Sequence, residues 1–113
     1  MTTFETGDIV SVEFPYSDLE RQKRRPGLVL SVDAEDLLLA RITTRPAYDR
    51  TDVALADWSF AGLPKSSTVR LTKLATVDRR LVLRRVGRIS STDGAALVQS
   101  LRGWLEQIGA RLT

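Results

Sequence analysis

The strongest constraint on the fold is a change of hydrophobic period along the chain: short apolar runs come first, and a single helical stripe comes last. Val10, Val12 and Phe14 alternate with polar residues, which is the two-residue period of a half-buried strand. Further short runs predict strands over residues 27–32, 37–43, 52–56 and 68–77. Residues 81–89 fit either a helix or a strand with a bulge at Gly87, and the strand is favoured.

The last segment has the period of an amphipathic helix. Its apolar residues recur at helical spacing and predict one stripe facing a core: Leu97, Leu101, Trp104, Leu105, Ile108 and Leu112. Ser91 and Thr92 are suitable N-cap residues, and Asp93 suits the positive start of a helix. Gly103 costs about 1 kcal/mol against Ala inside a helix, which close packing at that point would explain. Trp104 is interpreted as a core or dimer-interface residue.

Several short strands followed by one helix predict a mostly β (α+β) protein, a small antiparallel barrel or coiled sheet with a helix packed on it. The 113 residues suit a single domain, residues 1–113, with one hydrophobic core. No stretch approaches the length of a transmembrane helix, and the start of the chain lacks the features of an export signal. We therefore expect a cytoplasmic protein that does not enter a membrane.

Cysteine and histidine are both absent from the sequence. Their absence excludes disulfides, thiolate nucleophiles and the catalytic triads that use either residue. Most general acid–base enzymes rely on His, and zinc sites usually contain His or Cys. Any catalysis must therefore use carboxylates, hydroxyls, Lys or Arg, and we expect no metal site.

Positive charge is concentrated in two parts of the chain. The first is formed by Arg21, Lys23, Arg24 and Arg25. The second, residues 65–88, contains eight basic residues and one acid, Asp78. Local basic surface attracts phosphate backbones, but a plain solvated face would give the same pattern. On charge alone both interpretations stay open.

Several stretches in order resemble the MazF/PemK family of toxins. Residues 7–15 form a strand led by Gly-Asp, and a polar loop leads to residues 23–31, where an Arg-Pro pair enters an apolar strand that closes on Ser. Residues 40–44, Ala-Arg-Ile-Thr-Thr, resemble the family's strand that ends in Thr before a loop. Residues 67–90 resemble its last strands before a C-terminal helix. In the first loop, residues 17–22 depart from the Gly-Ser-Glu-Gln-like stretch of better-known members. The resemblance covers nearly the whole chain and implies an SH3-like or CcdB-like barrel.

The resemblance also implies a function. It indicates the toxin of a type II toxin–antitoxin system, an endoribonuclease that needs no metal or cofactor and works as a homodimer. Such an enzyme cleaves single-stranded RNA by attack of a 2′-OH on the adjacent phosphorus, leaving a 2′,3′-cyclic phosphate and a 5′-OH end. Because the substrate supplies the nucleophile, the lack of His and Cys is compatible with catalysis. The implied partners are single-stranded RNA, a second copy of the chain and a cognate antitoxin.

Arg25 and Thr43 match the family's catalytic Arg and Thr. A guanidinium stays charged and can clamp phosphate oxygens, so Arg25 is assigned charge stabilisation, with proton donation to the leaving oxygen as a second role. The Thr43 hydroxyl can donate to a phosphate oxygen. The group that accepts the 2′-OH proton is not evident from the sequence. RNA contacts are expected at a further set of residues: Lys23, Arg24, Thr44, Arg45, Ser17 and Asp18.

These residues also have structural interpretations. Arg25 can simply flank a turn, and Thr43 can be a β-branched strand residue. Trp58 and Tyr48 can stack unpaired bases, whereas Trp58 can equally belong to the core. Two other functions stay open: a non-catalytic toxin of the same fold that binds a protein target such as gyrase, and a basic RNA-binding barrel.

Overall fold

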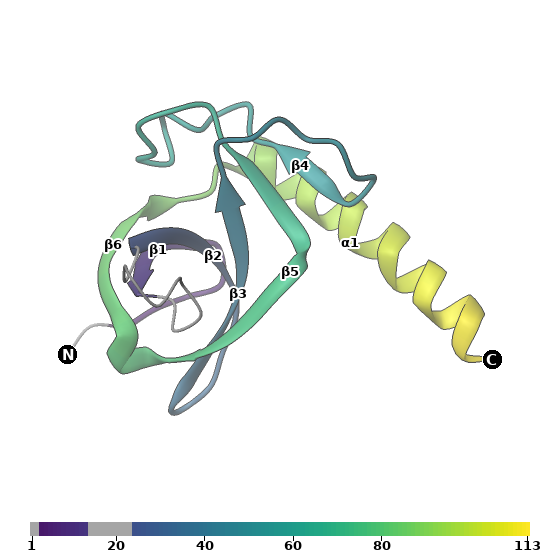
Figure 1. Cartoon of the computed structure of the whole chain (residues 1–113), viewed down its shortest axis with the longest axis horizontal. Coiled ribbons are helices and arrows are strands. Elements are labelled where there is room, and N and C mark those ends of the chain that lie inside the picture. Colours follow the sequence, from purple (N-terminus) through teal and green to yellow (C-terminus); the bar gives the residue numbers. More distant parts are fainter. Residues whose placement is uncertain (1–2, 14–23) are drawn as a thin grey trace, which may run out of the picture.

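The computed structural model describes residues 3–13 and 24–113. Within them, six strands form one antiparallel sheet in the order β4-β5-β3-β2-β1-β6. The elements are β1 (Asp8–Glu13), β2 (Arg24–Val32), β3 (Asp36–Thr43), β4 (Asp52–Ala54), β5 (Thr68–Asp78), the short 3-10 helix η1 (Arg79–Leu81), β6 (Val82–Arg88) and the helix α1 (Ser91–Leu112). The sheet curls into a barrel-like ring, and α1 runs outward from one side of it (Figure 1). The predicted class, a mostly β barrel with a C-terminal helix, is confirmed.

The curled sheet separates two apolar cores. Ile9 and Val10 are neighbours in β1 and both are 0% exposed, so β1 is covered on both faces, because successive side chains of a strand point to opposite faces. One core includes the start of α1: Ile9, Leu28, Ala40, Ile42, Val53, Leu55, Ala61, Leu63, Val69, Leu71 and Leu97. The other lies on the opposite face: Phe4, Val10, Val12, Val29, Leu37, Leu39, Ala75 and Val77.

Residues 82–88 form a strand with a bulge, as the favoured interpretation of this segment predicted. Ile9 pairs with Gly87 but Val10 pairs with Arg85, so one extra residue of β6 lies beside the predicted position. A Cβ on Gly87 would lie 2.1 Å from the carbonyl oxygen of Ala61. Glycine therefore lets the 55–67 segment approach β6 closely.

The strand β2 begins earlier than the sequence predicted. Arg24 and Arg25, expected in a loop, are its first two residues, and Pro26 lies inside it. The pairing of β2 with β3 starts only at Gly27, so one side of β2 is unpaired at Pro26, where the missing N–H costs no ladder bond. Residues 14–23, which include the end of the first predicted strand and most of the predicted loop, lie outside the described residues.

The helix α1 differs from its prediction at both ends. Its N-cap is Ser90, whose Oγ accepts the backbone N–H of Asp93 at 3.1 Å, and not Ser91 or Thr92. Leu97 is buried, but Leu105 is 61% exposed, so only the first half of the apolar stripe reaches a core. The helix has 22 residues, about 33 Å at 1.5 Å per residue, and extends past the barrel (Figure 1).

Two expectations about the second half of α1 are affected by this extension. Trp104 is only half-buried and belongs to neither core, so the first of its two interpretations, a core residue, does not hold, and the second, a dimer-interface residue, stays a prediction. A Cβ on Gly103 would meet nothing within 4 Å, so close packing within the chain does not explain this glycine. Within residues 3–13 and 24–113, no helix has the length and apolar character needed to span a membrane.

Candidate functional site

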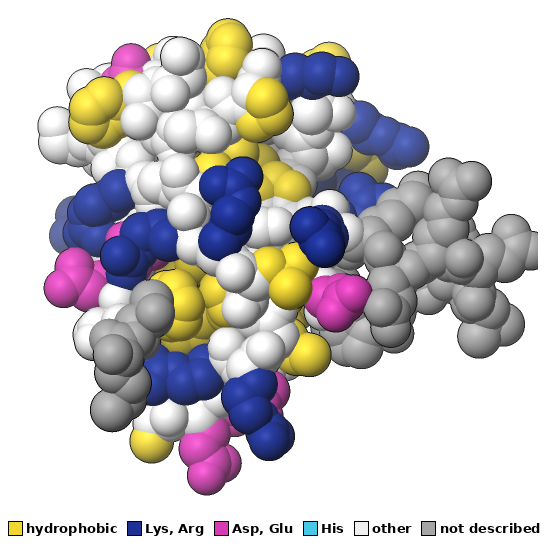
Figure 2. Space-filling view, turned by 90° about the vertical axis from the view of Figure 1, so that its left-hand side faces the viewer, with side chains coloured by type: hydrophobic (Ala, Val, Ile, Leu, Met, Phe, Trp, Pro, Cys, Tyr) yellow, Lys and Arg dark blue, Asp and Glu magenta, His cyan; other side chains and the backbone are white. Residues whose placement is uncertain are grey.

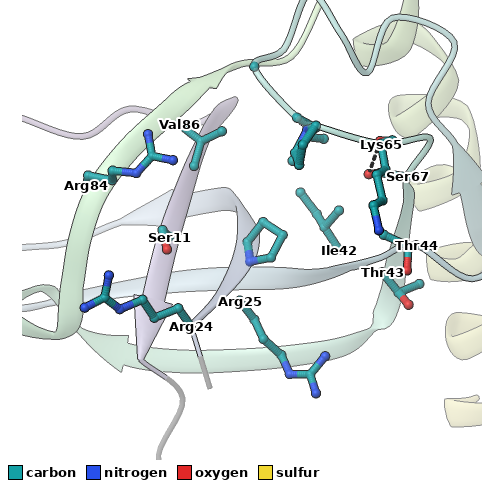
Figure 3. Close-up of a pocket in the computed structure, with 14 residues that line it drawn as sticks. Ser11, Arg24, Arg25, Ile42, Thr43, Thr44, Lys65, Ser67, Arg84 and Val86 are labelled. Carbon is teal, nitrogen blue, oxygen red and sulfur yellow. Dashed lines mark hydrogen bonds between the residues drawn. The ribbon is translucent and has the colours of Figure 1, made fainter. Parts of the chain in front are cut away.

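One pocket combines an apolar floor with a charged rim. It has a volume of about 290 Å³, and we call it the apolar pocket. Ile42, Leu63 and Val86 contribute apolar side chains, and Arg24 and Arg84 lie to one side with Lys65 across from them (Figure 3). Figure 2 shows one face of the molecule on which Lys and Arg side chains surround exposed apolar surface. Such a pocket can hold a flat apolar group beside an anion.

A second pocket is almost entirely cationic. It has a volume of about 230 Å³, and we call it the cationic pocket. Its lining consists of Arg25, Arg41, Ile42, Thr43, Arg45, Arg70 and Lys73. Among the described residues, no carboxylate lines this pocket, and although Asp52 pairs with Arg70, the remaining positive charge is open to an anionic ligand.

Arg25 and Thr43 line both pockets. Gly27 of β2 pairs with Arg41 of β3. Continuing this antiparallel register by two residues on each strand sets Arg25 opposite Thr43, on the same face of the sheet as Arg41. Ile42 lies between Arg41 and Thr43 and faces the core beneath the apolar pocket. Arg25 and Thr43 therefore lie where the two pockets meet.

The Thr43 side chain is held by the backbone that follows it. Its Oγ1 accepts the N–H of Arg45 at 3.2 Å. This bond uses one lone pair of the hydroxyl and leaves its hydrogen available for donation. The geometry therefore suits Thr43 to donate a hydrogen bond to a phosphate oxygen better than to act as a base.

The other predicted RNA contacts divide between the two pockets. Arg24 and Thr44 line the apolar pocket, and Arg45 lines the cationic pocket. Ser17, Asp18 and Lys23 lie outside the described residues. The structure thus brings the two predicted catalytic residues together with three of the six predicted RNA contacts.

Sequence reasoning did not single out several cations that line the pockets. They are Arg41, Lys65, Arg70, Lys73 and Arg84. Four of them fall within the basic run 65–88, which was the available signal, but the run also contains residues that point elsewhere: Arg85 and Arg88 bind the buried Asp8. Only the pairing of the strands distinguishes the basic residues that line the pockets from those that bind Asp8.

Arg70 is oriented by a carboxylate on the neighbouring strand. Asp52 of β4 pairs with Arg70 of β5, and its Oδ1 accepts the Arg70 Nε–H at 3.3 Å. This hydrogen bond raises the pKa of the Arg70 guanidinium above its ordinary value. The Tyr48 ring lies 5.3 Å from the guanidinium carbon of Arg70, at the distance of a cation–π contact.

The aromatic residues differ in their surroundings. Tyr48 is 84% exposed and remains accessible to a base. Trp58 is partly buried and packs against the core that includes Leu97, which supports its structural interpretation.

One wall of the apolar pocket is anchored to the start of α1. The wall is the segment 62–67, and the preceding residues 55–61 lead into it from β4. Asp93, only 2% exposed, accepts the backbone N–H groups of Ala56 at 2.9 Å and Asp57 at 2.8 Å. Ser90 Oγ donates to Asp57 Oδ2 at 2.7 Å. These contacts set the position of a segment that otherwise contains no strand or helix.

Comparison with known proteins assigns the family. The sequence profile of a family described as "PemK-like, MazF-like toxin of type II toxin-antitoxin system" matches residues 5–105. The chain therefore belongs to the PemK-like, MazF-like toxins of type II toxin–antitoxin systems, and the resemblance seen in the sequence is confirmed. No curated protein sequence matches the chain.

Solved structures of low sequence identity share the fold. A mycobacterial endoribonuclease in complex with its cognate antitoxin has a TM-score of 0.74 at 16% identity, covering 92% of this chain and 96% of that one. The Mycobacterium tuberculosis toxin MazF-mt6 has a TM-score of 0.72 at 20% identity, covering 88% and 96%. MazF in a MazE–MazF structure from Deinococcus radiodurans has a TM-score of 0.73 at 21% identity, covering 97% and 98%.

Proposed function

We propose that this toxin is a metal-independent endoribonuclease that cleaves single-stranded RNA at the junction of the two pockets. The observation that carries the proposal is the convergence of Arg25 and Thr43 at that junction, between an apolar pocket with a charged rim and a pocket lined mainly by cations. The family membership supports the same function, since a structural neighbour is itself described as an endoribonuclease.

The reaction proposed is an internal transfer of the phosphodiester. The 2′-oxygen forms a bond to the adjacent phosphorus, the bond from phosphorus to the 5′-oxygen breaks, and the products are a 2′,3′-cyclic phosphate and a 5′-OH end. The 2′-OH loses its proton and the leaving 5′-oxygen gains one. Negative charge builds on the non-bridging oxygens of the pentacoordinate phosphorane, and stabilising such charge is usually the largest catalytic term.

Arg25 and Thr43 supply that stabilisation. The guanidinium of Arg25 offers a planar fork of donors to two phosphate oxygens and stays charged throughout the reaction. The Thr43 hydroxyl, with its oxygen engaged by the Arg45 N–H, donates its hydrogen to the same phosphoryl group. Because these donors act directly on the substrate, the proposed reaction uses no metal and no cofactor.

The proposed partners follow from the surfaces around the site. The apolar pocket suits an unpaired nucleobase, and Arg24, Thr44 and Arg45 contact the RNA around the scissile phosphate; Lys23, Ser17 and Asp18 complete the proposed RNA-binding set. A cognate antitoxin would cover this groove and block RNA. A second copy of the chain would pack on the exposed apolar side chains of α1, which include Leu105 and Leu112. The proposed compartment is the cytoplasm, where RNA and antitoxin both occur.

The test is cleavage of a long RNA by the purified protein in the presence of EDTA. We expect discrete fragments with 5′-OH ends from the wild type. Arg25→Ala and Thr43→Val should each lower kcat by about 10²–10³-fold, the usual effect of removing one donor to a developing oxyanion. Arg102→Ala, which removes an exposed Arg from α1, is the matched control and should cleave as the wild type does.

Two results would point to the other functions. Intact RNA that is nevertheless bound, with strong salt dependence, would identify a basic RNA-binding barrel. Intact RNA that is not bound would favour a toxin acting on a protein target. Cleavage that EDTA abolishes would refute the metal-independent mechanism while leaving the ribonuclease activity.

A further inference from the structure

We propose that Arg41, Arg70 and Lys73 form a subsite for a second backbone phosphate of the same RNA strand, next to the phosphate held by Arg25 and Thr43. The proposal rests on the proposed binding of RNA, and it assigns a ligand to the part of the cationic pocket that the reaction itself does not use. We call these three residues the phosphate cluster.

Two like charges are paired directly across the sheet. Arg41 of β3 is the direct cross-strand partner of Arg70 of β5, so both side chains lie on the same face of the sheet. Like charges directly opposite each other destabilise a sheet. An anion bound between the two guanidinium groups would turn this repulsion into two attractions.

An irregularity of β5 brings a third cation to the same pocket. The partner of β3 changes from Leu74 at Ala40 to Arg70 at Arg41, so residues 71–73 have no partner on β3. Bulges of this kind re-aim side chains beside functional sites. Lys73 is carried by the bulge, is exposed, and lines the same pocket as Arg41 and Arg70.

Arg70 is oriented before a ligand binds. Asp52 engages Arg70 through its Nε, and Tyr48 also contacts this guanidinium. Terminal N–H donors beyond these contacts remain for a ligand, and a guanidinium held in this way loses less freedom when the ligand binds. Side-chain contacts of Tyr48 and Asp52 thus fix one of the three cations before RNA arrives.

The position of the cluster favours an RNA backbone over an acidic protein segment. The cationic pocket shares Arg25, Ile42 and Thr43 with the apolar pocket, so a ligand that crosses the junction continues from one to the other. A nucleic acid strand alternates a flat base with a phosphate, which matches an apolar pocket followed by a cationic one. An acidic peptide would match the second pocket only.

The experiment measures binding without cleavage. A fluorescent 12-nucleotide RNA with 2′-O-methyl groups throughout has no nucleophile, so its affinity can be titrated by anisotropy over a range of salt concentrations. For single strands the slope of log K against log salt is about −0.7 per phosphate contacted. The variants are Arg41→Gln, Lys73→Gln and the double variant, and the matched control is Arg102→Gln on α1.

A shared subsite predicts a flattening of the slope by up to about 0.7 in the double variant, because Arg41 and Lys73 contact the same phosphate and only Arg70 remains on it, and a smaller change in each single variant. Arg102→Gln should leave the slope unchanged. Arg41 and Lys73 are both exposed, so these substitutions do not disturb a core, and an unchanged melting temperature verifies this.

Four results would overturn the subsite. An unchanged slope in the double variant would show that the cluster does not contact RNA. A flattening of the salt-dependence slope by about 1.4 in the double variant would mean that Arg41 and Lys73 contact two separate phosphates. If the double variant binds RNA normally but no longer binds a hexaglutamate peptide that the wild type binds, the cluster belongs to an acidic protein partner. Wild-type protein that binds no RNA would refute the proposed function as well, whereas a binder that does not cleave would refute only the enzymatic proposal.

Discussion

Removing the Asp93 carboxylate should have two effects: it should destabilise the protein, and it should loosen one wall of the apolar pocket. The carboxylate accepts the backbone N–H groups of Ala56 and Asp57. Leaving a buried donor unpaired costs about 1–3 kcal/mol, and the lower half of that range applies because both bonds are only partly buried. Two donors at about 1.2 kcal/mol each, with about 0.5 kcal/mol for an acid in the first turn of α1, give about 3 kcal/mol for Asp93→Ala.

The assay is equilibrium unfolding in urea followed by far-ultraviolet circular dichroism. The midpoint should fall without a change in the slope m, and the melting temperature should fall by about 12 °C at roughly 4 °C per kcal/mol. Asp93→Asn keeps one acceptor oxygen and should cost about half as much. Glu106→Ala, at an exposed position of α1, is the control and should stay within about 0.5 kcal/mol of the wild type.

A loss below about 1 kcal/mol in Asp93→Ala would refute the reasoning, because it would mean that neither amide depends on the carboxylate. A functional readout separates the pocket from global stability. At a temperature where the variant remains folded, its KM for RNA should rise, since residues 62–67 line the apolar pocket and follow directly from the anchored segment.

Three further predictions follow from single contacts. Gly87→Ala should lower the free energy of unfolding in urea by at least about 1–3 kcal/mol, because the added Cβ would lie 2.1 Å from the Ala61 carbonyl oxygen. An unchanged free energy of unfolding would show that this close approach does not exist in solution. Gly103→Ala should raise the free energy of unfolding by up to about 1 kcal/mol, because a Cβ there meets nothing within 4 Å. A lower free energy of unfolding would indicate that another chain packs against this position. Hydrogen bonds from Arg80 lower the pKa of Asp78 from its ordinary value of 3.8 to about 2. The stability that this carboxylate contributes is therefore present above about pH 4 and lost as the pH falls toward 2. The difference in unfolding free energy between wild type and Asp78→Asn should shrink across that window, and a constant difference would contradict the assignment.

Local periodicity was sufficient to predict most of the elements. The alternation in β1 and the helical recurrence in α1 are direct consequences of which faces meet a core, so they are visible without any tertiary information. The exceptions have identifiable causes. The start of β2 was misread because Arg24 and Arg25 are polar and precede a proline. This end of β2 tolerates all three because it pairs with β1 on one side and is unpaired on the other.

The sequence by itself determined the family and predicted the pair Arg25 and Thr43 as catalytic residues, because the ordered motifs that carry these residues are local stretches of chain. It also determined that any catalysis must proceed without His or Cys. Only the tertiary structure decided which of the many cations lie together. The phosphate cluster draws on two strands that are 29 residues apart at Arg41 and Arg70, and a bulge adds Lys73. Cross-strand register and bulges depend on long-range hydrogen bonding, and a shift of one residue would turn these side chains to the opposite face.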